Sequence, residues 1–296
     1  MIEKIYEAAF NLWNRLCTIA MTLFTTSPTS ANGSVYTITY GLYNAITDIA
    51  VPIAITFFLI AIIQDVLATS PEQQVRRLFN DLLKFGVLVA ILANLWTIMG
   101  YIMQIADGIT DKFATSGTYS LSVSSELKSI IRSVENNKPD VEIKFKTFGE
   151  DFMEYMEELM DYLLNLIVLF VASVATFAGI LSAGLSLINS SYQRIIKPLA
   201  IMPFSSITVA LAAGTADAKR TTTSYIKTFF GFCISGAFMV ICVKLGTALS
   251  DGLLSFNMDS MDLIEKVLLI SVQNAVTPMM IAGLVKSTDS VIQRFF

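Results

Sequence analysis

Residues 150–171 read EDFMEYMEELMDYLLNLIVLFV, so that a run of carboxylates passes directly into an apolar run. The carboxylates close the one long polar segment of the chain, residues 106–163, which has apolar runs of membrane-spanning length on both sides. About 20 predominantly apolar residues cross the hydrocarbon of a bilayer as a helix. The pattern predicts a polytopic membrane protein with a helix that begins near Glu150 and enters the membrane without a break.

The composition points to lipid as part of the solvent. The chain is 54% hydrophobic and 15% charged, with a mean hydropathy of +0.63, whereas soluble domains carry about 25% charged residues. The net charge of −4 gives no support for a nucleic-acid-binding surface. There is no histidine, and the three cysteines form no C-x-x-C pair. Together with the absence of a phosphate-binding loop motif, this predicts no catalytic, metal or cofactor site, and bound lipid is the only ligand expected.

Outward from the opening stretch, the apolar runs predict an all-α protein with five transmembrane helices. Residues 1–34 form an amphipathic helix and a loop, with the apolar stripe Ile5, Ala9, Leu12, Leu16, Ile19 and Leu23. This helix lies on the membrane surface or docks on a neighbouring subunit. Residues 35–106 hold the first two spans, of which the second covers residues 85–105. Residues 161–296 hold the other three, beginning with residues 162–188, together with a hairpin at about 194–227.

Residues 107–160 are expected to form a folded loop. Leu127, Ile130, Ile131 and Val134 fall at helical spacing, and apolar and charged residues alternate over residues 141–146, which predicts a short strand. The short turns at the far ends of the flanking spans are basic. Since Lys and Arg in short loops stay in the cytoplasm, the loop is predicted to lie outside the cytoplasm, as is the N-terminus. The C-terminus and the turns that hold Arg76 and Arg194 are predicted to be cytoplasmic.

The stretch from 194 to 227 is the most unusual. Its apolar part is shorter than a full span, contains Pro203, and has basic residues on both sides. We expect a re-entrant hairpin with both ends in the cytoplasm, beside a conduit; the alternative is a short helix packed against the other spans. The candidate conduit residues are Arg194, Lys197, Pro198, Pro203, Gly214, Lys219 and Arg220.

Small and polar residues within the spans are candidates for helix packing. Small side chains spaced by four let helix backbones approach closely in lipid. These residues face neighbouring helices of the same chain or other subunits: Ala175, Gly179, Ala183, Ser182 and Ser186. Asn94, Gln273 and Asn274 are polar side chains within the spans. Gln273 and Asn274 are expected to hydrogen-bond between helices rather than to bind a ligand.

Two stretches resemble the TrbL/VirB-six family, the polytopic membrane subunits of type IV secretion and conjugation machines. The first runs from residues 192–198 through Pro203 and residues 212–214 to residues 225–229, and the second is the tail, residues 281–287 with Arg294. The order of spans, with one large outer loop after the second, is also similar to that family. The likeness covers most of the chain, although residues 1–34 depart from it.

The resemblance implies a non-enzymatic channel component in the bacterial cytoplasmic membrane. Members of the family form a ring, of five copies, at the base of a conduit for single-stranded DNA with its relaxase, or for effector proteins. The other channel subunits and cytoplasmic ATPases are the implied partners. Two other functions fit the composition: a small-solute permease or membrane subunit of an importer, and a pore-forming lysis or toxin-immunity protein.

Overall fold

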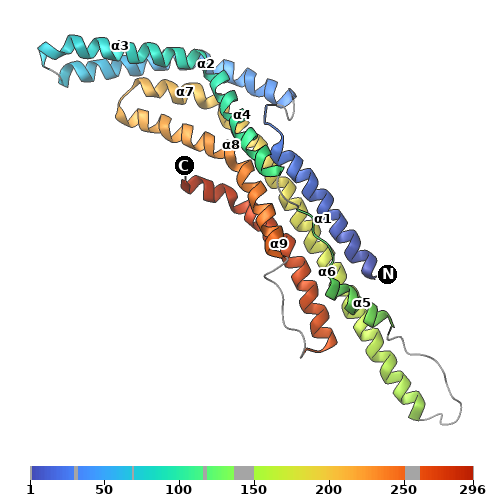
Figure 1. Cartoon of the computed structure of the whole chain (residues 1–296). Helices are drawn as coiled ribbons and strands as arrows, with labels where there is room; N and C mark the ends of the chain where they lie inside the picture. Colours follow the sequence, from blue (N-terminus) through green and yellow to red (C-terminus); the bar gives the residue numbers. More distant parts are fainter. Residues whose placement is uncertain are drawn as a thin grey trace. The chain divides into compact units, whose positions relative to one another are not determined.

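The chain is an all-α polytopic membrane protein. The structure, a computed structural model, describes residues 2–29, 33–68, 70–115, 119–136, 150–250 and 261–295. These ranges contain helices and no strand (Figure 1). Four helical segments are long and apolar enough to cross a membrane, and a bent pair of helices would make a fifth. The strand predicted at residues 141–146 lies outside the described residues.

The chain divides into two compact units. The first comprises Met1–Ala20, Gly117–Asn189 and Ile241–Lys286, and the second comprises Met21–Ser116, Ser190–Val240 and Ser287–Phe296. Each unit therefore collects segments that lie far apart in the sequence.

In the first unit, helix α1 (Ile2–Thr25) packs on other helices of its own chain. The Tyr6 hydroxyl is 2.7 Å from the Ser271 hydroxyl of α9 (Leu263–Phe295), and both side chains are buried. The amphipathic helix is confirmed, but its buried face is centred beside the predicted stripe, of which Ala9 is buried and the others except Ile19 are half-buried. The buried stripe contains Tyr6, Trp13 and Cys17, whereas Ile19 is 49% exposed, because the aromatic side chains bury more apolar area than Ile and Leu do.

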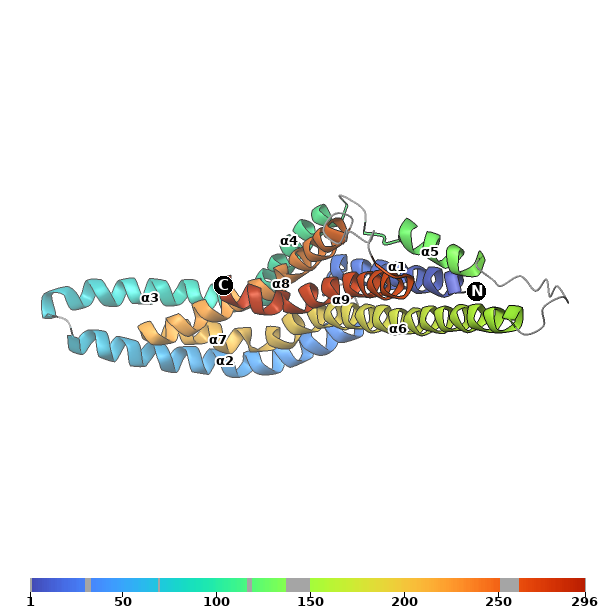
Figure 2. The same cartoon turned by 90° about the horizontal axis from the view of Figure 1, so that it is seen from below.

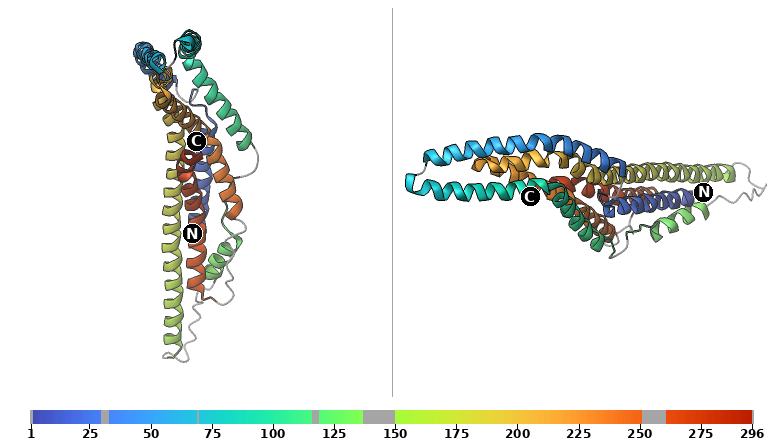
Figure 3. Two further views of the ribbon diagram at one scale, coloured as in Figure 1. Left: turned by 90° about the vertical axis from the view of Figure 1, so that its left-hand side faces the viewer. Right: turned by 90° about the horizontal axis from the view of Figure 1, so that it is seen from above.

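Helix α5 (Ser125–Asn136) gives the predicted loop its folded structure. Leu127, Ile131 and Val134 are buried in one cluster with residues of α1, α6 and α9. Helix α6 (Glu150–Ile201) begins where the sequence predicts and runs beside α9 (Figure 3). Contact between the two is close, because a Cβ on Gly179 would lie 2.6 Å from Met279 Cε.

In the second unit, α2 (Gly33–Ala68) and α3 (Pro71–Ala93) form an antiparallel pair joined at Ser70 (Figure 2). Pro71 opens α3, as predicted, because the first turn of a helix does not need its N–H. Both helices expose large apolar side chains along most of their length, including Ile55, Leu59, Ile63, Phe79 and Leu83. Such faces are typical of contact with lipid.

The second predicted span is not one continuous helix. Helix α3 ends at Ala93, and α4 (Leu95–Ala114) leaves at an angle of 67° after Asn94. An aromatic cluster holds the bend, because the Trp96 indole donates to the Tyr36 hydroxyl at 2.7 Å and packs within about 5 Å of the Tyr40 and Tyr43 rings. Hydropathy alone does not distinguish a bent pair from a straight span.

The stretch for which a re-entrant hairpin is predicted turns back once, at Gly214. Helix α6 ends at Ile201 and is followed by η1 (Met202–Phe204), α7 (Ser205–Ala210) and η2 (Leu211–Ala213). The chain turns at Gly214 and returns as α8 (Ala216–Ser250). The outgoing arm is thus the continuation of α6 rather than a separate short segment.

Candidate functional site

The outgoing arm of the hairpin is broken by proline and repaired by side chains of α8. Pro203 has no N–H and clashes with the preceding turn, so α6 gives way to a 3₁₀ turn. The Tyr225 hydroxyl donates to the carbonyl of Ile201 at 2.8 Å, and the Thr222 hydroxyl donates to the carbonyl of Thr208 at 2.6 Å. In lipid every backbone group needs a partner, and these two bonds join the arms at Ile201 and Thr208.

A buried ion pair lies at the base of the outgoing arm. Arg194 Nη2 donates to Asp107 Oδ1 of α4 at 2.7 Å, and Nη1 donates to the carbonyls of Leu23 and Thr26 at 3.2 and 3.1 Å. Arg194 is 2% exposed and Asp107 is 7% exposed. Three segments distant in sequence therefore meet at one guanidinium, which also satisfies carbonyls at the end of α1.

This contact corrects the predicted sidedness of the chain. The charge rule placed Arg194 in the cytoplasm and Asp107 outside, but a 2.7 Å contact puts both at one depth. The rule assumes that the Lys and Arg side chains of a short loop remain in water. It failed here because Arg194 is buried and paired with a carboxylate. The twenty residues from Ile195 to Gly214, helical apart from two 3₁₀ turns, are about as many as cross the hydrocarbon core of a bilayer. We therefore expect Arg194 and the hairpin turn to lie on opposite sides of the membrane.

Gly236 of α8 makes room for the guanidinium. A Cβ built on Gly236 would overlap Arg194 Nε and lie 2.5 Å from Cζ. The guanidinium cannot move aside without losing its three acceptors. The absence of a side chain at this position is thus a condition for the ion pair.

The first turns of α8 present a polar face. Eight side chains on residues 217–228 are exposed and hydrophilic, and Ile226 is the exposed exception: Asp217, Lys219, Arg220, Thr221, Thr223, Ser224, Lys227 and Thr228. We call these eight residues the polar face of α8. Several of the hydroxyls bond to carbonyls of their own helix, so the three cations are the groups that most need water.

Lys227 lies farthest from the hairpin turn among these cations. It is 13 residues past Gly214, roughly 20 Å along the helix. The bond from Tyr225 to Ile201 places this turn beside the middle of the apolar arm. No ion pair to Lys227 occurs within the described part of the chain. A charged side chain at such depth normally faces a protein interior or a water-filled cavity.

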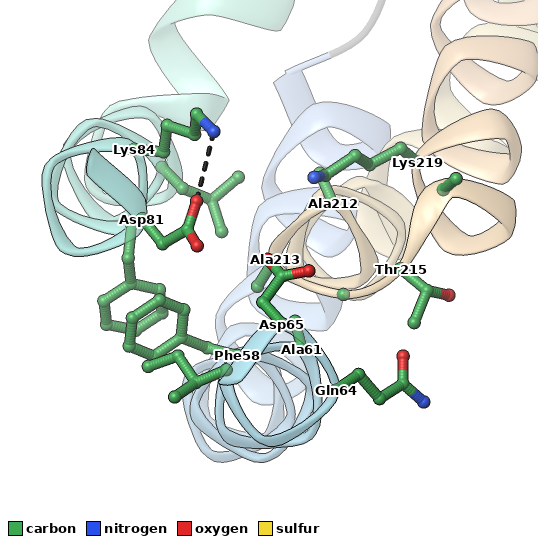
Figure 4. A pocket seen from close by; sticks show the side chains of 15 residues that line it. Phe58, Ala61, Gln64, Asp65, Asp81, Lys84, Ala212, Ala213, Thr215 and Lys219 are labelled. Atoms are coloured by element: carbon green, nitrogen blue, oxygen red, sulfur yellow. Dashed lines mark hydrogen bonds and ion pairs between the residues drawn. The ribbon is translucent and has the colours of Figure 1, made fainter. Parts of the chain in front are cut away.

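A cleft of about 390 Å³ lies at the turn end of the second unit, between α2, α3 and residues 212–219 (Figure 4). Its charged groups are Asp65 of α2, Asp81 and Lys84 of α3, and Lys219 of α8. Lys84 Nζ is 3.1 Å from Asp81 Oδ1. The apolar wall includes Phe58 and Phe85, whose rings stack at 4.1 Å.

The predicted conduit residues separate into two groups. Lys219 and Arg220 are exposed on the polar face of α8, and Lys197 is partly buried, with Nζ 5.9 Å from the centre of the Phe232 ring. Arg194, Pro198, Pro203 and Gly214 are buried, so these four are structural. Gly214 ends η2 and lines the cleft.

The predicted packing residues also divide. Gly179 and Ala183 are buried within the chain, which is the internal packing that the spacing favours, whereas Ala175 and Ser182 are exposed and Ser186 is partly buried. Asn274, expected to bond between helices, instead donates to the carbonyl of Ile270 in its own helix, and Asn94 likewise donates to the carbonyl of Ala90.

Sequence reasoning missed the groups that join the segments. Asp107 was counted with the carboxylates of the loop, and Trp96 and Tyr225 were not given roles. A signal was present, since Asp107 follows an apolar run directly, but its partner is 87 positions away. Comparison of the chain with family models, with curated proteins and with solved structures found no match.

Replacing one residue of the ion pair should lower the free energy of unfolding more than replacing both residues does. Asp107→Ala leaves a buried guanidinium without its counter-charge, and we expect a loss of about 3–5 kcal/mol. Asp107→Ala/Arg194→Met should recover part of that loss in thermal unfolding of the purified protein. Asp111→Ala, one turn along at an exposed position, is the control and should change little. Equal losses in the single and double variants would contradict a buried pair.

Gly236→Ala should destabilise the protein by about 1–3 kcal/mol or more through overpacking, since the added methyl displaces the guanidinium. Gly283→Ala is the matched control in a helix, because a Cβ on Gly283 would have nothing within 4 Å. This control should be neutral or stabilising by about 0.5–1 kcal/mol. Unfolding midpoints of the two variants in detergent measure the difference. Similar midpoints would contradict the conclusion that Gly236 leaves the space that the Arg194 guanidinium occupies.

Residues beside the ion pair should share one side of the membrane. With the three native cysteines replaced, we expect Asp111→Cys and Gln193→Cys, both at exposed positions, to react with an impermeant thiol reagent from the same side. Asp217→Cys beyond the turn should react from the opposite side. Labelling of Gln193→Cys and Asp217→Cys from one side would restore the re-entrant interpretation.

Proposed function

We propose that the chain is a subunit of a translocation channel, of the kind that the TrbL/VirB-six family supplies to type IV secretion and conjugation machines. The observation that carries the proposal is Lys227, an exposed cation two residues after Tyr225, which bonds to Ile201 of the apolar arm. By contrast, α2 exposes Ile49, Val51 and Ile55. Lipid suits the isoleucines and not the cation. The polar face of α8 therefore needs water at membrane depth.

A ring of copies supplies that water. One chain presents its polar face on one helix, which is too little surface to enclose an aqueous passage. Copies related by a rotation axis bring their polar faces around a shared lumen while the apolar faces of α2 and α3 contact lipid. The charge rule then sets the orientation: Arg76, Arg77 and Lys84 share the turn end with Lys219, so this end is cytoplasmic.

A lumen with cationic and hydroxyl side chains suits transient passage of a polyanion or a protein. Conduction requires that each contact be weak enough for release. Arg220 and Lys227, with hydroxyl side chains between them, attract phosphate without forming a continuous basic groove. Energy would come from partner ATPases, and the cargo would be single-stranded DNA with its relaxase, or an effector protein.

The cleft is the observation that favours a second function, that of a small-solute permease. Its volume fits a small ligand and it holds charges of both signs. However, it lies at the turn end of the unit rather than at mid-depth, where transporter sites lie. A monomer in gentle detergent would favour the permease, whereas a symmetric ring would favour the channel.

Cysteine accessibility tests the lumen. In membranes, we expect Lys227→Cys and Thr223→Cys to react with a charged, impermeant thiol reagent. Ile55→Cys and Leu59→Cys, on the apolar face of α2, should not react. Native mass spectrometry of the same preparation should give a multiple of 32.5 kDa. A solitary chain, or Lys227→Cys as unreactive as Ile55→Cys, would overturn the proposal.

A further inference from the structure

We infer that the cleft at the turn end of the second unit binds the headgroup of a zwitterionic phospholipid. The inference does not depend on the proposed channel, since every group involved belongs to one copy. Its basis is the arrangement of charges and apolar side chains around one cavity (Figure 4).

The cleft holds two carboxylates and two ammonium groups, and one group of each kind has no ion pair within the described residues. Asp65 and Asp81 face Lys84 and Lys219, so the site as a whole is neutral. Asp81 and Lys84 are paired at 3.1 Å, whereas no ion pair within the described residues engages Asp65 or Lys219. In Figure 4 the Lys84 and Lys219 side chains extend over the same space and Asp65 lies beneath them. A ligand with one anionic and one cationic group can therefore pair with both Lys219 and Asp65.

The chemistry of the two groups follows from the residues. Two lysine ammonium groups on one side of a cavity suit a phosphate, which accepts several charge-assisted hydrogen bonds. The Asp65 carboxylate suits an ammonium. A phosphoethanolamine headgroup carries both charges within a few bonds, and a headgroup of this size fits a cleft of about 390 Å³.

The apolar part of the cleft accounts for the acyl chains. Phe58, Ile62, Phe85 and Leu88 line it beside the charged groups. Outside it, α2 and α3 expose Leu59, Ile63 and Leu82, which continue an apolar path for hydrocarbon. A soluble solute has no hydrocarbon chain to cover these apolar side chains. Basic pockets between transmembrane helices bind anionic lipid headgroups; a neutral pocket with charges of both signs instead matches a zwitterionic one.

The test is lipid titration of the full chain followed by native mass spectrometry. We expect phosphatidylethanolamine to bind more tightly than phosphatidylglycerol. Lys219→Gln should weaken phosphatidylethanolamine binding about tenfold, as expected for loss of a charge-assisted hydrogen bond. Arg220→Gln, the adjacent exposed cation outside the cleft, is the matched control and should leave binding unchanged.

Asp65→Asn tests the role of this carboxylate through lipid preference, which a purely structural role of Asp65 would leave unchanged. Removing this charge leaves the cleft with a net positive charge, so the preference should shift toward phosphatidylglycerol, whereas the exposed Asp217→Asn should not shift it. Equal binding of the two lipids by the wild-type protein, or unchanged binding by Lys219→Gln, would overturn the inference. Displacement of the lipid by millimolar inorganic phosphate would also overturn it, since that identifies a site for soluble phosphate.

Discussion

The second unit depends on the burial of one guanidinium. Arg194 connects α6 to α4 through Asp107 and to the end of α1 through two carbonyls, and Gly236 of α8 leaves the space in which it sits. A buried ion pair contributes little net stability, but an unmatched member is costly. The pair therefore acts chiefly as a specificity device, because alternative packings of these apolar helices would leave a charge without a partner.

Helix packing in lipid lacks the hydrophobic driving force that orders a soluble core. Four apolar helices can exchange neighbours at small cost unless polar contacts identify the right ones. Tyr225 with Ile201, Thr222 with Thr208 and Trp96 with Tyr36 have this role in the second unit, and Tyr6 with Ser271 has it in the first. Each joins segments that hydropathy treats as equivalent.

The parts of the fold that could be predicted are those that local sequence determines. Carboxylates before an apolar run located the start of α6, Pro71 located the start of α3, and the spacing of Leu127, Ile131 and Val134 located α5. The bend at Asn94 could not be predicted, because it depends on Trp96 meeting three tyrosines of α2. The partner of Arg194 could not be predicted either, since the helix pairing that brings Asp107 to it is a tertiary property.

The failure of the charge rule at Arg194 has a consequence for the sites on the hairpin. The rule reads basic residues as topological markers, which is valid when they remain in water. Arg194 is paired and buried, so it does not act as a topological marker. Apart from the partly buried Lys197, the other cations of the hairpin are exposed and belong to α8: Lys219, Arg220 and Lys227. One arm is then apolar and proline-broken, and the other is polar and continuous. Because the two arms are aligned by the bonds from Tyr225 and Thr222, their surfaces differ in polarity at equal depth. Lipid suits the apolar arm and not the cations of α8, and this difference is the basis for the proposed aqueous lumen on the side of α8.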